Sequence, residues 1–171
     1  MTSLNRPGRA LALAFALGLP AAALSISALP ASALAAGPFA SLSGYWTGAG
    51  TITMKNGTSE RIRCRATYAV NDAGNALNQS LRCASDSYRL EIAGNIQVNN
   101  GAVTGDWSEQ TRHARGVISG GATNSAILAR VDGAGFSAGL DVRFKGAQQS
   151  ISIRPTGGSD VTDVAITLRK G

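Results

Sequence analysis

The stretch RIRCRATYAVNDAGNALNQSLRCAS, residues 61–85, decides the fold because it contains both cysteines of the chain. The cluster NDAGN in its middle is typical of a turn, and the flanking segments 61–70 and 76–84 are typical of two antiparallel strands. With the turn centred in this cluster, Cys64 faces Cys83. Directly opposed antiparallel residues lie about 4.5–5.5 Å apart at Cα, within disulfide range. The sequence therefore predicts a Cys64–Cys83 disulfide across a hairpin, which stabilises the fold by roughly 3 kcal/mol.

The same register sorts the hairpin side chains into two faces. The cysteine face is mostly apolar and also holds Ile62, Ala66, Tyr68, Val70, Leu77, Gln79, Leu81 and Ser85. The opposite face is polar and carries Arg61 facing Asp86, and Arg63, Arg65 and Arg82. Alternation with a period of two, in phase on both strands, indicates a hairpin with one buried side.

The rest of the chain repeats this pattern of short strands and tight turns. Residues 136–145, FSAGLDVRFK, alternate strictly, and Asn100-Gly101 is a two-residue hairpin turn that pairs Val98 with Val103. We count about ten strands, and no stretch shows a helical period. The sequence therefore predicts an all-β fold, an antiparallel up-and-down barrel of about 8–10 strands, with a sandwich as second choice.

The first 35 residues have the features of a secretory signal peptide. Arg6 and Arg9 precede a long apolar run, which ends in the small-residue pattern of Ala33 and Ala35. Two prolines interrupt the run, which argues against an uncleaved membrane anchor. Cleavage after Ala35 leaves residues 36–171 as a single barrel domain. We expect an exported protein, periplasmic or secreted, in which two cysteines form a disulfide.

The charge of the exported chain excludes one class of partner. Loss of the two signal-peptide arginines lowers the formal charge from +6 to +4, and the remaining charges are dispersed. This is too little to indicate nucleic-acid binding. A barrel that spans a membrane is not expected either, because several strands have polar outer positions and aromatic residues are only 5% of the chain.

No motif gives a convincing catalytic site. GFSAG, residues 135–139, matches the G-x-S-x-G nucleophile pattern, but Ser137 lies inside a predicted strand, whereas the motif needs a strand, a turn and a helix. His113 is the only histidine, and it precedes the serine instead of following it. Two cysteines and one histidine do not make a metal-ligand set. We therefore predict a protein that is not an enzyme and uses no cofactor or metal.

Arginines on the polar face of the hairpin form a candidate anion-docking site. Arg65 is predicted to face Arg82, with Arg63 beside them, although opposed like charges are unfavourable. One interpretation is a docking strip for phospholipid headgroups, polysaccharide or an acidic protein surface. The favoured interpretation is a solvated face whose arginines keep the sheet soluble.

GYWTGAG, residues 44–50, resembles the Gly-x-Trp motif that opens the first strand of lipocalin-like (calycin-type) barrels, with Gly44 and Trp46 at the matching positions. In that family the tryptophan lies at the closed end of the barrel and an arginine of the last strand packs over it. The resemblance implies that Arg169 has this role here. The chain is also similar to small exported proteins of alphaproteobacteria, and this likeness implies no activity.

These observations predict an exported binding domain that holds a small apolar or amphipathic ligand in or at the barrel. The candidate interior residues are Trp46, Tyr68, Leu81, Leu90, Ile92, Phe136, Leu140 and Phe144. Ordinary core packing also explains each of them. The alternative function is an envelope docking, structural or inhibitor module that binds an anionic partner through Arg63, Arg65 and Arg82.

Overall fold

The computed structural model describes residues 36–171, and the predicted signal peptide lies outside the described residues. A short 3-10 helix, η1 (Ala40–Leu42), precedes ten strands. In chain order the strands are β1 (Gly44–Met54), β2 (Ser59–Val70), β3 (Ala76–Ala84), β4 (Arg89–Asn99), β5 (Ala102–Glu109), β6 (Ala114–Thr123), β7 (Ala126–Gly133), β8 (Phe136–Lys145), β9 (Gln148–Gly157) and β10 (Val161–Lys170). Within this part of the chain, no helix is long and apolar enough to cross a membrane.

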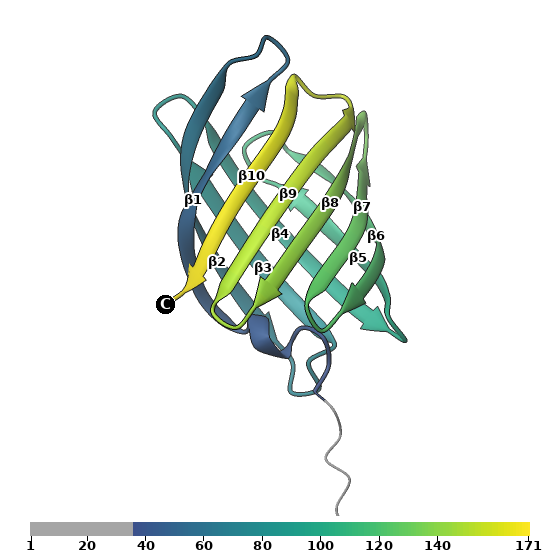
Figure 1. Ribbon diagram of the computed structural model, residues 1–171. Coiled ribbons are helices and arrows are strands. Elements are labelled where there is room, and N and C mark those ends of the chain that lie inside the picture. Colours follow the sequence, from purple (N-terminus) through teal and green to yellow (C-terminus); the bar gives the residue numbers. More distant parts are fainter. Residues whose placement is uncertain (1–35) are drawn as a thin grey trace, which may run out of the picture. The chain divides into compact units, whose positions relative to one another are not determined.

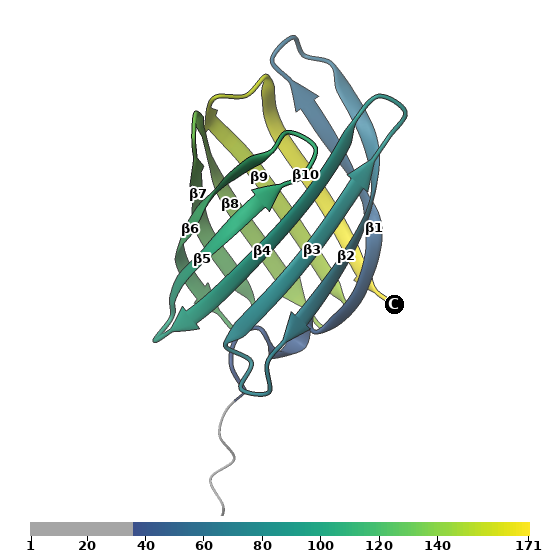
Figure 2. The ribbon, with the colours of Figure 1, turned by 180° about the vertical axis from the view of Figure 1, so that it is seen from behind.

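The ten strands form one closed antiparallel barrel (Figures 1 and 2). Each strand pairs with the next strand along the chain, and β10 pairs with β1 to complete the ring. The predicted up-and-down barrel is confirmed, and the alternative of a sandwich is wrong. Closure pairs each of the ten strands on both sides, which protects a chain rich in strands from edge-to-edge association.

Strands β2 and β3 form the predicted hairpin in the predicted register. Cys64 faces Cys83 with 4.1 Å between their Cα atoms, and the two sulfurs are bonded. In the turn, the side-chain oxygen of Asn71 accepts hydrogen bonds from the backbone N–H groups of Asn75 and Ala76. The turn chemistry thus fixes the register, and the register brings the cysteines together.

The hairpin ends earlier than predicted. The β2–β3 ladder stops at Arg63, so Arg61 does not face Asp86. In the connection to β4, the hydroxyl and the backbone N–H of Ser87 both donate to the carboxylate of Glu60. This contact belongs to the loop that leads into β4, and Asp86 lies in that loop instead of in the ladder.

One end of the barrel, which we call the closed end, is covered by the residues that precede β1 (Figure 1). The backbone N–H groups of Gly37 and Phe39 donate to the carbonyls of Ala73 and Gly74 in the β2–β3 turn, at 2.8 and 2.9 Å. These bonds hold η1 across the barrel opening. Leu42 of η1 and the preceding Phe39 are fully buried, so the closed end is a packed apolar plug.

Trp46 lies at the closed end. It is fully buried, and its indole N–H donates to the carbonyl of Leu42 at 2.7 Å. Lys170 faces Trp46 in the β1–β10 ladder, holds its ammonium 5.7 Å from the ring centroid and donates to the carbonyl of Ser41. The expectation that Arg169 covers the tryptophan is wrong. Because side chains alternate along a strand, Arg169 points outwards and its neighbour Lys170 takes the place.

Two inward-facing glycines let neighbouring strands approach closely. A side chain on Gly48 would overlap the backbone carbonyl of Thr167 in β10, and one on Gly116 would overlap that of Asp132 in β7. Glycine at such positions is typical of strands that bend sharply around a small barrel.

Candidate functional site

The barrel encloses a cavity of about 500 Å³. It reaches from Leu42, in the plug of the closed end, to the opposite end, which we call the mouth. The mouth is formed by the connections β1–β2, β3–β4, β5–β6, β7–β8 and β9–β10 (Figure 2). The wall is mainly aliphatic and includes Ile96, Ile118, Val131 and Ile153 from four different strands.

Six of the eight predicted interior residues line this cavity. They are Tyr68, Leu81, Leu90, Ile92, Phe136 and Leu140. Trp46 and Phe144 do not line it. Trp46 is fully buried in the plug of the closed end, and Phe144 is buried at the start of the β8–β9 turn. Both residues belong to the packed core, because they lie at the level where the barrel is filled by its own side chains.

Polar groups lie deep in the cavity, among the apolar wall residues. The hydroxyl of Tyr68 donates to the side-chain carbonyl of Gln149 at 2.9 Å, and Gln79 lines the same space. Burial raises the pKa of Tyr68 to about 12, although the hydrogen bond to Gln149 partly offsets this. The phenol is therefore neutral at physiological pH. The sequence analysis did not identify Gln149. Its inward position could have been predicted, because it lies in phase with Ile151 and Ile153 along β9.

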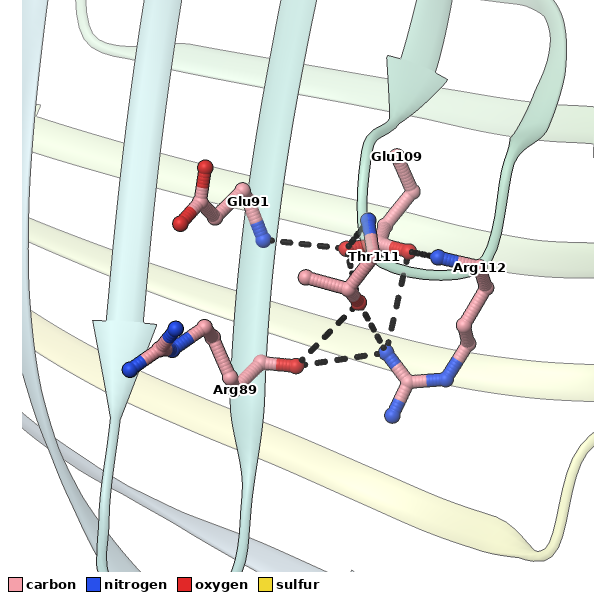
Figure 3. A network of polar contacts seen from close by, with 5 residues as sticks. All are labelled: Arg89, Glu91, Glu109, Thr111 and Arg112. Carbon is pink, nitrogen blue, oxygen red and sulfur yellow. Dashed lines mark hydrogen bonds and ion pairs between the residues drawn. The ribbon is translucent and has the colours of Figure 1, made fainter.

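A buried carboxylate lies at the mouth, where β5 meets the β5–β6 loop (Figure 3). Glu109 is only 5% exposed. One of its oxygens accepts hydrogen bonds from the backbone N–H of Glu91 at 3.0 Å and from the N–H and hydroxyl of Thr111 at 3.2 and 2.7 Å. The other accepts from the backbone N–H of Arg112 at 2.7 Å. The carboxylate thus ties the loop to β4.

Two opposing effects set the ionisation of Glu109. Burial by itself raises the pKa of a carboxyl, but the hydrogen bonds from the backbone of Glu91 and from Thr111 and Arg112 outweigh burial. The pKa of Glu109 therefore lies below its ordinary value of 4.5. The group is an anion at neutral pH, and both of its oxygens already accept hydrogen bonds from the protein.

Arg112 extends from the same loop over the mouth. Its guanidinium lies 4.7 Å from the ring centroid of Tyr88, and its Nη1 donates to the carbonyl of Arg89 at 3.3 Å and to the hydroxyl of Thr111 at 3.1 Å. The same nitrogen is 3.7 Å from the carboxylate of Glu109. The side chain lines the cavity and is about half exposed to solvent.

Sequence reasoning noted the histidine of this loop and missed the Glu109–Arg112 pair. His113 is exposed and does not line the cavity. The available signal was the phase of β5, because Val103 and Trp107 point inwards and Glu109 continues their alternation. A charged residue at an inward position is costly unless it is bonded, so it marks a built polar site.

The three candidate docking arginines lie together on the outer face of β2 and β3. Arg65 faces Arg82 directly, as predicted, and Arg82 is 3.8 Å from Glu91 on β4. Within residues 36–171, Arg63 and Arg65 make no ion pair. On the other side of the barrel, three arginines each contact an acid, in the pairs Arg130–Asp132, Arg143–Asp141 and Arg154–Asp163.

Ser137 of the GFSAG segment lies inside β8. Its hydroxyl forms a hydrogen bond with the hydroxyl of Thr156 on β9 at 2.8 Å. The strand continues without a turn or a helix, so the backbone lacks the sharp bend that exposes a nucleophilic serine. The segment therefore matches the nucleophile motif in sequence but not in backbone structure.

Comparisons with known proteins support the fold. No protein-family model and no curated protein sequence matches the chain. The crystal structure of Rv2717c from M. tuberculosis is similar, with a TM-score of 0.60 and 16% identity over 77% of this chain and 94% of that one. The S-type phycobiliprotein lyase CPES from Guillardia theta is also similar, with a TM-score of 0.55 and 8% identity over 78% of this chain and 90% of that one. The chain therefore has the fold of a lipocalin-like, calycin-type barrel.

Proposed function

We propose that this protein is an exported binding domain whose barrel holds one small apolar or amphipathic ligand. The observation that carries the proposal is the cavity of about 500 Å³ that opens at the mouth. Ligand sites are typically concave, mostly apolar and about 300–1,000 Å³ in volume, with a few polar groups that fix orientation. This cavity meets each condition, since its apolar wall carries polar groups deep inside and at the mouth.

Two further points support binding. A protein with the same fold is a phycobiliprotein lyase, which favours a barrel that handles a small molecule. Both oxygens of Glu109, which lies in the wall, are engaged in hydrogen bonds that tie the β5–β6 loop to β4. We therefore propose that the cavity binds its ligand without changing it chemically.

Filling the cavity should abolish binding. We expect the neutral fluorophore N-phenyl-1-naphthylamine to bind with one-to-one stoichiometry, and Leu140→Trp to weaken its binding at least about ten-fold because the indole occupies the ligand space. Leu128→Trp is the matched control, because Leu128 is 52% exposed on the outer face of the neighbouring strand. It should leave the affinity unchanged. Raised salt should have little effect on either protein, since the contact is apolar.

The measurement is a fluorescence titration, with thermal unfolding of each variant to show that it is folded. Absence of fluorophore binding to the unaltered protein would contradict the proposal. Equal affinities of the Leu140→Trp and Leu128→Trp variants would contradict it as well, since the fluorophore would then be bound outside the barrel.

A second candidate function is docking to an anionic lipid surface through Arg63, Arg65 and Arg82. The observation that favours it is the asymmetry of the outer surface. On β7–β10, Arg130, Arg143 and Arg154 are each paired with an acid, whereas Arg63 and Arg65 have no acidic partner within residues 36–171. Arginines without acidic partners keep their full attraction for phosphate groups.

Binding to vesicles of phosphatidylglycerol and phosphatidylcholine tests this second function. Because each basic residue near an anionic surface contributes about 1 kcal/mol, the triple variant Arg63→Gln, Arg65→Gln, Arg82→Gln should bind roughly 100-fold more weakly at low salt. The control variant Arg130→Gln, Arg143→Gln, Arg154→Gln makes the same change in net charge. Equal losses of vesicle affinity in the two triple variants would show that only the net charge matters, and would contradict a docking face.

A further inference from the structure

The charged groups of the cavity differ in what they offer a ligand. Three of the lining residues carry a charge, namely Glu109, Arg112 and Asp160. Both oxygens of Glu109 accept hydrogen bonds from the protein. Asp160 lies in the β9–β10 connection, four strands around the ring from the β5–β6 loop. At the mouth beside β5, the charge left for a ligand is therefore that of Arg112.

The contacts of Arg112 leave part of its guanidinium unused. The hydrogen bonds to Arg89 and Thr111 both use Nη1, and the contact with Glu109 involves the same nitrogen. Within the described residues, Nε and Nη2 have no hydrogen-bond partner. These two nitrogens form the flat edge of the guanidinium that matches two oxygens of a carboxylate, sulfate or phosphate.

The surroundings hold this edge in place before any ligand arrives. The guanidinium lies 4.7 Å from the ring centroid of Tyr88, and the backbone N–H of Arg112 is fixed by Glu109 at 2.7 Å. A side chain that is already ordered loses little entropy when it binds an anion. Below it, the wall is formed by Tyr88, Leu90 and Ile92 and continues into the apolar barrel.

We propose, on the basis of the ligand-binding function above, that the ligand is an amphiphile with one anionic headgroup. Its two oxygens accept hydrogen bonds from Nε and Nη2 of Arg112 at the mouth. Its apolar chain extends into the cavity along Leu90, Ile92 and Leu140. Arg112 therefore determines ligand specificity, because an amphiphile of the same length without the anion lacks a partner for this guanidinium edge.

The test is displacement of N-phenyl-1-naphthylamine by three amphiphiles with the same chain, tetradecanoate, 1-tetradecanol and tetradecyltrimethylammonium. We expect tetradecanoate to bind about ten-fold more tightly than 1-tetradecanol, and the cationic compound to bind most weakly. Arg112→Gln should remove the preference for tetradecanoate over 1-tetradecanol. Arg112→Lys should retain part of it, because the charge remains and the two-nitrogen edge is lost.

Arg115→Gln is the matched control, because Arg115 is exposed on β6 close to the same loop and does not line the cavity. It changes the net charge equally and should preserve the preference. Equal affinity of the unaltered protein for tetradecanoate and 1-tetradecanol would contradict the headgroup inference alone. Equal preferences of the Arg112→Gln and Arg115→Gln variants for tetradecanoate over 1-tetradecanol would also contradict the headgroup inference alone. Failure of both amphiphiles and of the fluorophore to bind would contradict the ligand-binding function itself.

Discussion

Replacing Glu109 with alanine should lower the free energy of unfolding by about 3 kcal/mol, because three backbone N–H groups at the mouth lose their acceptor. These groups belong to Glu91, Thr111 and Arg112. Each buried donor without a partner costs about 1–3 kcal/mol, and water that enters from the mouth recovers part of this. Urea unfolding followed by circular dichroism gives the value. A loss below about 0.5 kcal/mol would show that the network does not hold the loop.

Glu109→Gln separates the charge of the group from its shape. The amide retains one acceptor oxygen but presents an NH₂ group to the remaining N–H donors, so we expect a smaller loss than for alanine. The unaltered protein should also lose more stability than this variant as the pH falls. Because folding holds the pKa of Glu109 below 4.5, its contribution to stability is complete above pH 4.5 and is lost as the pH falls from there through the folded-state pKa. Equal slopes below pH 4.5 in both proteins would contradict this role.

Removal of the disulfide should lower the free energy of unfolding by a similar amount. The bond joins Cys64 to Cys83, which are separated by 19 residues in sequence, and a loop of this size corresponds to about 3 kcal/mol of stabilisation through the unfolded chain. The double variant Cys64→Ala, Cys83→Ala and the unaltered protein in reductant should lose comparable stability in urea. Reductant should have no effect on the double variant, which serves as the control. Equal stability of the oxidised and reduced protein would contradict the prediction.

The hairpin shows which parts of this fold can be predicted from sequence. Three independent features predict the register of this hairpin, and all three agree. They are the alternation with a period of two, the turn with strong Asn and Gly signals, and the pair of cysteines. At the closed end, the same alternation corrects the family resemblance. Arg169 and Leu168 cannot both point inwards, and the apolar residue is the buried one. The alternation of side chains along the strand therefore predicts the inward residue better than the family resemblance does.

The cavity and its polar mouth could not be predicted in the same way. Alternation says which side chains point inwards, but the volume they leave depends on how closely the strands pack. Gly94 and Gly116 flank Trp107 in the β4–β5–β6 ladder, and this arrangement is visible only once the strands are paired. The alternation of β5 places Glu109 inwards, but its bonding partners are not visible in the sequence, because they come from a strand 18 residues away and from its own loop.

The most direct test of the central claim, that the barrel interior is a ligand site, is a crystal structure with tetradecanoate that carries a terminal bromine. We expect one anomalous peak inside the barrel, among Ile96, Ile118 and Leu140, with the carboxylate of the same molecule at Arg112. A cavity filled by repacked side chains, with bromine only on the outer surface of the barrel, would contradict it.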